Sequence, residues 1–168
     1  MSDGPIALGL DPGLATTGYG LVRLAPRGWE VVAGGTIETE AGLPRTERLV
    51  EIYREVRALI ETYNPIGVAI EEIYLARNAR TAMGTAETRG VILLAAHGTP
   101  VRGYTPLQVK KRITGYGKAN KAQVQATVRQ LLGLAELPKP DDMADGLALA
   151  LCYLLDISGV RREEHAYL

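Results

Sequence analysis

Four carboxylates stand where the predicted strands and helices begin or end: Asp11, Glu71, Asp142 and Asp145. The first two each follow an apolar run typical of a strand, residues 6–10 and 66–70. The last two lie three residues apart at the start of an apolar helical pattern, so they share one helix face. Carboxylate oxygens gathered from three elements indicate a site for hard divalent cations, for which phosphate is the natural substrate.

The ligand types narrow the choice of metal. Neither cysteine nor histidine accompanies the acids, which favours Mg²⁺ or Mn²⁺ over Zn²⁺. Four negative charges would be balanced by two divalent cations, and without metal at least one carboxyl group would stay protonated or the site would splay. Two ions about 3.5–4 Å apart could activate water on one side of a phosphodiester and stabilise the leaving oxygen on the other.

Each acid also has a simpler interpretation. Asp11 lies in Gly-Leu-Asp-Pro-Gly, a sequence typical of a tight turn, and Glu71 could be an ordinary charge at a strand end. Asp141 and Asp142 would both be favoured in a first helical turn by the helix dipole, and Asp141 is the N-cap candidate. Glu72 points to the opposite face by strand alternation, so it is the less suitable ligand.

Basic residues gather in one part of the chain although the net charge is zero. Ten of the nineteen Lys and Arg lie between residues 73 and 135, where Glu87 is the only acid. Such a stretch attracts a polyanion. The candidate DNA contacts are Lys110, Lys111, Arg112, Lys118 and Lys121. Lys121 should reach the scissile phosphate, because it lies in a first helical turn. Tyr74 could stack on an exposed base or be partly buried in the core.

The hydrophobic patterns predict a mixed α/β fold. Three strands with turn residues between them predict an antiparallel meander, and alternating helices and strands follow. A five-stranded sheet flanked by helices is expected. The predicted strands are residues 6–11, 17–24, 29–38, 66–70 and 101–104, and the predicted helices are residues 43–63, 78–97, from 105, 119–132 and 141–155.

The length of 168 residues predicts a single domain over residues 1–157, with residues 158–168 as a flexible C-terminal tail. Cys152 lies in an apolar run and is expected to be a small core residue. No stretch approaches the roughly 20 apolar residues that span a membrane, and no secretory signal is visible at the start. A reducing cytoplasm is the expected location.

Several motifs together resemble the RuvC family of Holliday-junction resolvases, in the RNase H-like nuclease superfamily. They occur in the family's order over residues 6–155. The matching segments are Gly-Leu-Asp-Pro-Gly at 9–13, Thr-Gly-Tyr-Gly at 17–20, Ala-Ile-Glu at 69–71, Ala-Arg-Asn at 76–78, Arg-Gly-Val at 89–91, Gln-Val-Lys at 108–110, the Gly-x-Gly-x-Ala-x-Lys-x-Gln-Val segment at 115–124, and Asp-Met-Ala-Asp-Gly-Leu-Ala at 142–148.

The resemblance implies a homodimer with an RNase H-like fold that nicks four-way DNA junctions symmetrically, using Mg²⁺ or Mn²⁺, in partnership with the RuvA–RuvB branch-migration complex. It implies that the four acids bind metal and that Lys110 and Lys121 serve phosphate binding and catalysis. Tyr74 matches the aromatic residue placed at the junction centre, where phenylalanine is frequent. Arg77 and Asn78 are further expected DNA contacts. The segment after Asn78 departs from the leucine-rich pattern common in the family.

Three alternatives stay open at this point. The same acids could serve an RNase H acting on RNA–DNA hybrids, or a flap nuclease. A non-catalytic junction-binding module would need only the basic stretch. A sugar kinase or actin-like ATPase would share Gly-x-Asp-x-Gly at 9–13, but it needs a second lobe for which the chain has no room.

Overall fold

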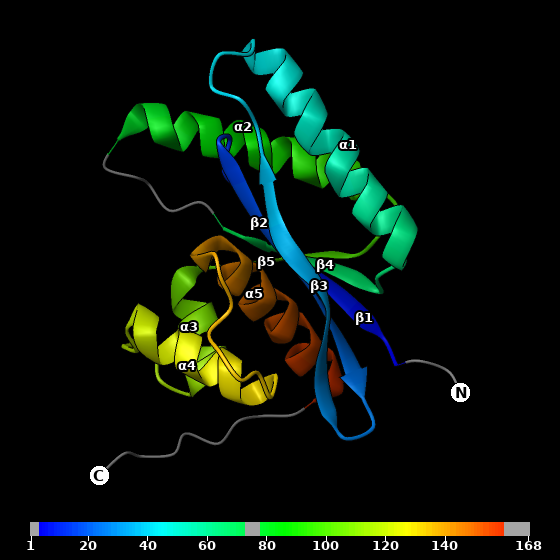
Figure 1. Ribbon diagram of the computed structural model, residues 1–168, viewed down its shortest axis with the longest axis vertical. Coiled ribbons are helices and arrows are strands. Elements are labelled where there is room, and N and C mark those ends of the chain that lie inside the picture. Colours follow the sequence, from blue (N-terminus) through cyan, green and yellow to red (C-terminus); the bar gives the residue numbers. More distant parts are fainter. Residues whose placement is uncertain (1–3, 73–77, 160–168) are drawn as a thin grey trace.

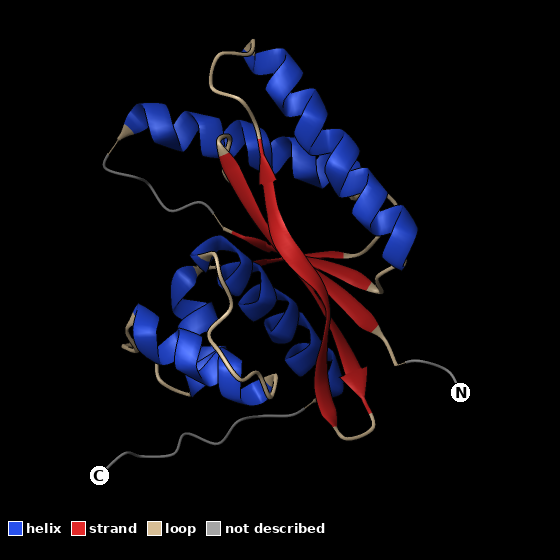
Figure 2. Cartoon of the chain, viewed as in Figure 1, coloured by secondary structure: helices blue, strands red, loops and turns tan. Residues whose placement is uncertain are grey.

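One mixed sheet organises the computed structural model, which describes residues 4–72 and 78–159. Its strand order is β3-β2-β1-β4-β5 (Figures 1 and 2). The strands are β1 (Ile6–Asp11), β2 (Thr16–Ala25), β3 (Gly28–Glu38), β4 (Gly67–Glu71) and β5 (Val101–Tyr104). β1, β2 and β3 form the predicted antiparallel meander, and β4 and β5 add in parallel beside β1. The predicted fold class is therefore confirmed.

The helices cover both faces of this sheet. α1 and α2 lie on one side, and α3, α4 and α5 lie on the other (Figure 1). Their bounds are α1 (Arg45–Tyr63), α2 (Ala79–Ala95), α3 (Pro106–Thr114), α4 (Lys121–Leu131) and α5 (Asp141–Ser158). In the described ranges, no helix combines the length and apolar character needed to cross a bilayer.

Local sequence explains where the basic helices begin. Thr105 caps α3 and Asn120 caps α4, each by accepting a hydrogen bond from a backbone N–H in the first turn. Gln108 and Gln123 complete a capping box by accepting a hydrogen bond from the backbone N–H of the capping residue. α5 continues to Ser158, three residues past its predicted end. Most of the predicted tail, residues 160–168, lies outside the described residues.

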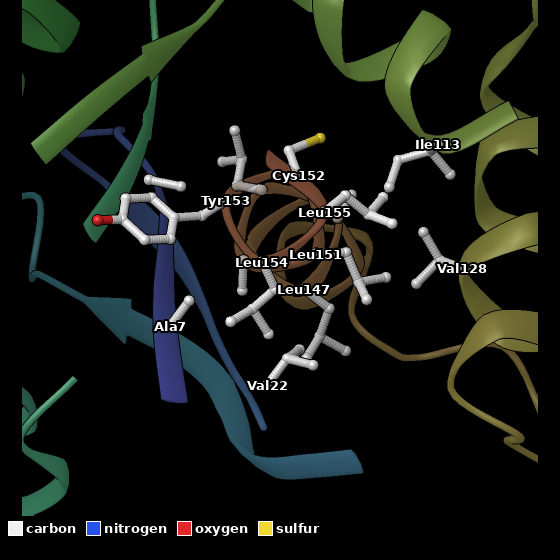
Figure 3. Packing of buried hydrophobic residues seen from close by; sticks show 14 of the residues in the cluster. Ala7, Val22, Ile113, Val128, Leu147, Leu151, Cys152, Tyr153, Leu154 and Leu155 are labelled. Atoms are coloured by element: carbon white, nitrogen blue, oxygen red, sulfur yellow. The ribbon is translucent and has the colours of Figure 1, made fainter. Parts of the chain in front are cut away.

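Strand alternation divides the apolar residues into two cores. Leu8 and Leu10 face α1 and α2, where they join a cluster that includes Ile52. Ala7, which directly precedes Leu8 on β1, points to the opposite face and belongs to the cluster around α5. Figure 3 shows this second core, with Leu147, Leu151 and Leu154 of α5 among its labelled residues. Cys152 is fully buried within it, which confirms its prediction as a core residue.

Glycines let α5 lie directly against the backbone of β1 and β2. A Cβ atom at Gly9 would collide with the carbonyl oxygen of Gly146, and one at Gly20 would come within 2.5 Å of the Leu147 nitrogen. In return, a Cβ at Gly146 would come within 2.5 Å of the Tyr19 carbonyl carbon. We call Gly9, Gly18, Gly20 and Gly146 the glycine seam. Because only hydrogen atoms separate helix and strands along this seam, the start of α5 is set relative to the end of β1.

Candidate active site

The sheet register brings the two strand-end acids together. Leu10 of β1 pairs with Ile70 of β4 in parallel, so Asp11 and Glu71 follow at the same edge of the sheet. Both side chains are half-buried. On its other side, Glu71 pairs in register with Tyr104 of β5, so β4 has a neighbour on both sides at this point.

A network of side chains holds the turn that follows Asp11. The Thr17 hydroxyl donates to the Gly13 carbonyl oxygen at 2.8 Å and accepts the Gly13 N–H at 3.3 Å. Thr17 is fully buried, so little competes with these bonds. The Thr39 hydroxyl likewise donates to the Leu14 carbonyl oxygen at 2.5 Å. The backbone that presents Asp11 is therefore tied to β2 and to the end of β3.

The glycine seam also places the helix acids. Gly18 pairs with Asp11 across β1 and β2, and a Cβ at Gly18 would collide with the backbone of Asp142. The first turn of α5 therefore lies over the residue that neighbours Asp11. Asp145, one turn further on and half-buried, lies on the same helix face as Asp142. The four acids predicted from the sequence come together at one edge of the sheet.

Burial and the nearby charges raise the pKa values of Asp11, Glu71 and Asp145. Burial and the negative charge of Glu71 raise the pKa of Asp11 to about 8. Burial and the charge of Asp11 raise the pKa of Asp145 to about 6. Burial also raises the pKa of Glu71, while its hydrogen bond with Asp11 works in the opposite direction. The acids oppose one another electrostatically, which is expected where like charges must share a site.

This arrangement suits a divalent cation, although the side chains do not form a closed cage. Across residues 4–72 and 78–159, no three His, Cys, Asp or Glu side chains converge into a preformed metal-binding cluster. Strand pairing and the glycine seam nevertheless place Asp11 close to Glu71 and Asp142, and the charges of both contribute to the raised pKa of Asp11. The donors are all carboxylate oxygens, which Mg²⁺ and Mn²⁺ prefer. A cation would replace the proton that Asp11 otherwise retains, so the residues fit a hard metal ion.

Within the ranges that the structure describes, Lys121 approaches one of these acids closely enough to form an ion pair. It lies in the first turn of α4, as predicted, although the helix begins at Lys121 and not at residue 119. Its ammonium lies 3.9 Å from the Asp145 carboxylate and 3.2 Å from that of Asp141. The hydrogen bond with Asp141 and the charge of Asp145 raise the pKa of Lys121. The same bond, with one from Gln125, lowers the pKa of Asp141.

The interpretation of Asp141 as an N-cap was wrong. Pro140 occupies the N-cap position of α5, which makes Asp141 the first helical residue. Its side chain makes no cap hydrogen bond and turns instead to α4, where Gln125 donates to it at 3.2 Å. Proline has no side-chain acceptor, so this helix begins without a side-chain cap.

The other predicted DNA contacts differ in their surroundings. Lys118 and Lys111 are exposed and Lys110 is half-buried, all on the side of the sheet that carries α3 and α4. Arg112 forms an ion pair with Asp156 of α5, so the protein itself provides a partner for it. Asn78 is exposed, and its side chain caps α2 by accepting the Arg80 N–H at 3.0 Å. Tyr74 and Arg77 lie outside the described residues.

Glu72 differs from its neighbour Glu71. Arg89 of α2 donates a hydrogen bond to the Glu72 carboxylate at 3.0 Å. The Glu72 side chain crosses β5 at Gly103, where a Cβ atom would collide with it. This ion pair fastens the end of β4 to α2 and gives Glu72 a role apart from the four acids.

Two contributors to the site were missed at the sequence level. Thr17 lies in a motif used for the resemblance, but nothing in the local pattern showed that its hydroxyl would close the turn after Asp11. Gln125 lies four residues after Lys121, a spacing that places both on one face of α4. That spacing could have indicated a shared partner, and the structure identifies the partner as Asp141.

Comparisons with known proteins identify the family of the chain. The family model "Crossover junction endodeoxyribonuclease RuvC" matches residues 7–153. The protein of that name from Syntrophomonas wolfei is 53% identical over 149 residues, which cover 88% of this chain and 87% of the relative. The one from Caldicellulosiruptor saccharolyticus is 47% identical and covers 94% of this chain and 96% of the relative.

Solved structures extend the comparison to the fold. "T. thermophilus RuvC in complex with Holliday junction substrate" is similar with a TM-score of 0.87 and 33% identity, covering 91% of this chain and 94% of the other. The class is thus that of the metal-dependent nucleases that hydrolyse phosphodiester bonds. Within this class, the chain belongs to the RuvC family of crossover junction endodeoxyribonucleases.

Proposed function

We propose that this protein resolves four-way DNA junctions by nicking opposed strands at a site built from Asp11, Glu71, Asp142 and Asp145. The observation that carries the proposal is the convergence of these acids, set by the parallel pairing of β1 with β4 and by the glycine seam beneath α5. Carboxylates that lie close together repel one another when ionised. The site therefore favours cation binding, because each bound cation reduces this repulsion.

The acids and the lysines of the site would have different roles in cleavage. The four carboxylates would hold two Mg²⁺ or Mn²⁺ ions, which supply activation of water and stabilisation of the leaving oxygen when bound. Asp11 and Glu71 provide the rigid side of the site, because the sheet sets their backbones. Lys121 lies at the start of α4, where its ammonium and the first backbone N–H groups favour a phosphate oxygen. Lys110, Lys111 and Lys118 would bind the flanking backbone phosphates.

The proposed substrate and partners follow from symmetry and from the relatives. A four-way junction is close to two-fold symmetric, so a homodimer with two equivalent sites could cut opposed strands. The T. thermophilus relative was solved in complex with a Holliday junction substrate. We propose the same substrate here, a homodimer as the active form, and cooperation with a RuvA–RuvB branch-migration complex. Tyr74, together with Arg77 and Asn78, would contact the DNA near the crossover.

A panel of substrates tests this proposal. Purified protein is incubated with four-way junctions, linear duplexes, flaps and RNA–DNA hybrids, each with Mg²⁺, with Mn²⁺ or with chelator. We expect metal-dependent paired nicks in the junction and little cleavage of the other substrates. Preferred cleavage of hybrids or flaps would assign the site to another nuclease activity. Binding of junctions without cleavage under every metal condition would indicate a binding module, and robust cutting in chelator would exclude the metal site.

A further inference from the structure

Asp141 connects the start of α5 to the start of α4 through two contacts. One of its carboxylate oxygens lies 3.2 Å from the Lys121 ammonium. The other accepts a hydrogen bond at 3.2 Å from the Gln125 side chain, one turn further along α4. Because the two contacts use different oxygens, the orientation of the carboxylate is fixed and not merely its distance. Asp141 is not one of the four acids assigned to metal binding.

These contacts restrict a side chain that would otherwise be free to move. The Lys121 side chain is 58% exposed, and an unrestrained surface lysine samples many rotamers. An ammonium has three N–H donors. In the structure, the Lys121 nitrogen lies 3.2 Å from the Asp141 carboxylate and 3.9 Å from that of Asp145, so the ammonium stands beside the acids of the site.

We propose that Asp141 is a positioning residue for cleavage, which holds the Lys121 ammonium beside the acids so that it meets the scissile phosphate already oriented. This inference rests on the proposed function, because it assumes that Lys121 contacts that phosphate. Asp141 itself neither binds metal nor touches the substrate. Its contribution passes entirely through Lys121, and Gln125 supports it by fixing the second carboxylate oxygen.

A double-mutant cycle tests the inference. Single-turnover junction cleavage is measured for wild type, Asp141→Asn, Lys121→Ala and the double variant, together with the Mg²⁺ concentration that gives half-maximal rate. Glu136→Gln is the matched control, because it removes an exposed carboxylate from the loop after α4. Thermal unfolding of each variant shows whether folding is retained.

We expect Asp141→Asn to slow cleavage about two- to fivefold, the size typical of an exposed ion pair. In the Lys121→Ala background the same substitution should change nothing, and the half-maximal Mg²⁺ concentration should stay at the wild-type value. Asp141→Glu should restore part of the rate, and Gln125→Ala should slow cleavage less than Asp141→Asn. Glu136→Gln should cleave like wild type.

Two outcomes would overturn the inference while leaving junction cleavage itself intact. A rate defect that persists without Lys121, with a raised Mg²⁺ requirement, would make Asp141 a metal ligand. An Asp141→Asn rate equal to wild type would show that the contact has no part in cleavage. Failure of the wild-type protein to cut junctions at all is a separate result, which would refute the proposed function on which the inference depends.

Discussion

Two pairs of charged side chains at the site are held in opposite ways. Asp11 and Glu71 are half-buried acids whose backbones are set by strand pairing, so their repulsion cannot be relieved by moving apart freely. Lys121 and Asp141 are opposite charges on two helix starts, and their side chains are 58% and 64% exposed. The first pair stores unfavourable electrostatics that a cation can relieve. The second pair is mutually favourable but screened by water, so it orients a group at little energetic cost.

The largest expected effect comes from removing charge from the buried pair. Asp11→Asn should lower single-turnover cleavage of a four-way junction on the order of 10³-fold or more, the scale seen when a member of a catalytic set is removed. Junction binding, measured by gel shift in the presence of Ca²⁺, should persist. Full cleavage activity in this variant, or in Glu71→Gln, would contradict the assignment of these acids as metal ligands.

A substitution in the glycine seam tests the close packing of α5 on the sheet without changing any charged side chain. Gly146→Ala places a methyl group against the Tyr19 backbone, so we expect the free energy of unfolding to fall by about 1–3 kcal/mol or more. Gly90→Ala is the matched control, since Gly90 is also helical but has no atom near its would-be Cβ. That substitution should stabilise the protein by about 0.5–1 kcal/mol. Denaturant unfolding measures both, and equal effects would show that the seam is not tight.

A pH series in metal-free buffer sharpens the comparison. The folded-state pKa of Asp11, about 8, lies above its ordinary value of 3.8, so wild type should lose stability as pH rises between these values. Asp11→Asn lacks this loss and should melt above wild type at pH 8, with the advantage shrinking towards pH 4. Each kcal/mol corresponds to roughly 2–4 °C in the melting temperature of a protein of this size.

Added Mg²⁺ provides the control for this series. It should raise the melting temperature of wild type at pH 8, because a bound cation relieves the repulsion around Asp11. The same addition should have much less effect on Asp11→Asn. Parallel pH profiles for the two proteins without metal would contradict the raised pKa of Asp11.

The smallest effect is expected for the exposed pair in DNA binding. Lys121→Ala should reduce the slope of log affinity against log salt by about one, because one phosphate contact no longer releases a counterion. Lys118→Ala, which removes another exposed lysine of the same region, should give a similar change in slope. Only Lys121→Ala should also slow cleavage at saturating protein. An unchanged cleavage rate would remove Lys121 from the reaction.

Much of the fold and of the acid set could be predicted from local patterns. Asp11 and Glu71 were found because each ends an apolar run, and parallel pairing of those runs was enough to bring them together. The roles of Asp141 and Thr17 could not be found in this way. Both depend on contacts between elements that meet only after folding: the start of α5 against α4, and β2 against the turn after β1. Position within a helix suggested a cap for Asp141, but tertiary packing gave it another partner.

The glycine seam has a consequence for how this protein tolerates insertions. With Gly146 locked against β1 and β2, everything before it on α5 takes its angular position from that contact. One extra residue between Asp145 and Gly146 would turn the preceding aspartates about 100° around the helix axis. Asp142 and Asp145 would then face away from Asp11, although every residue of the site would still be present. The spacing of the chain at this point is therefore as much a part of the nuclease as its side chains.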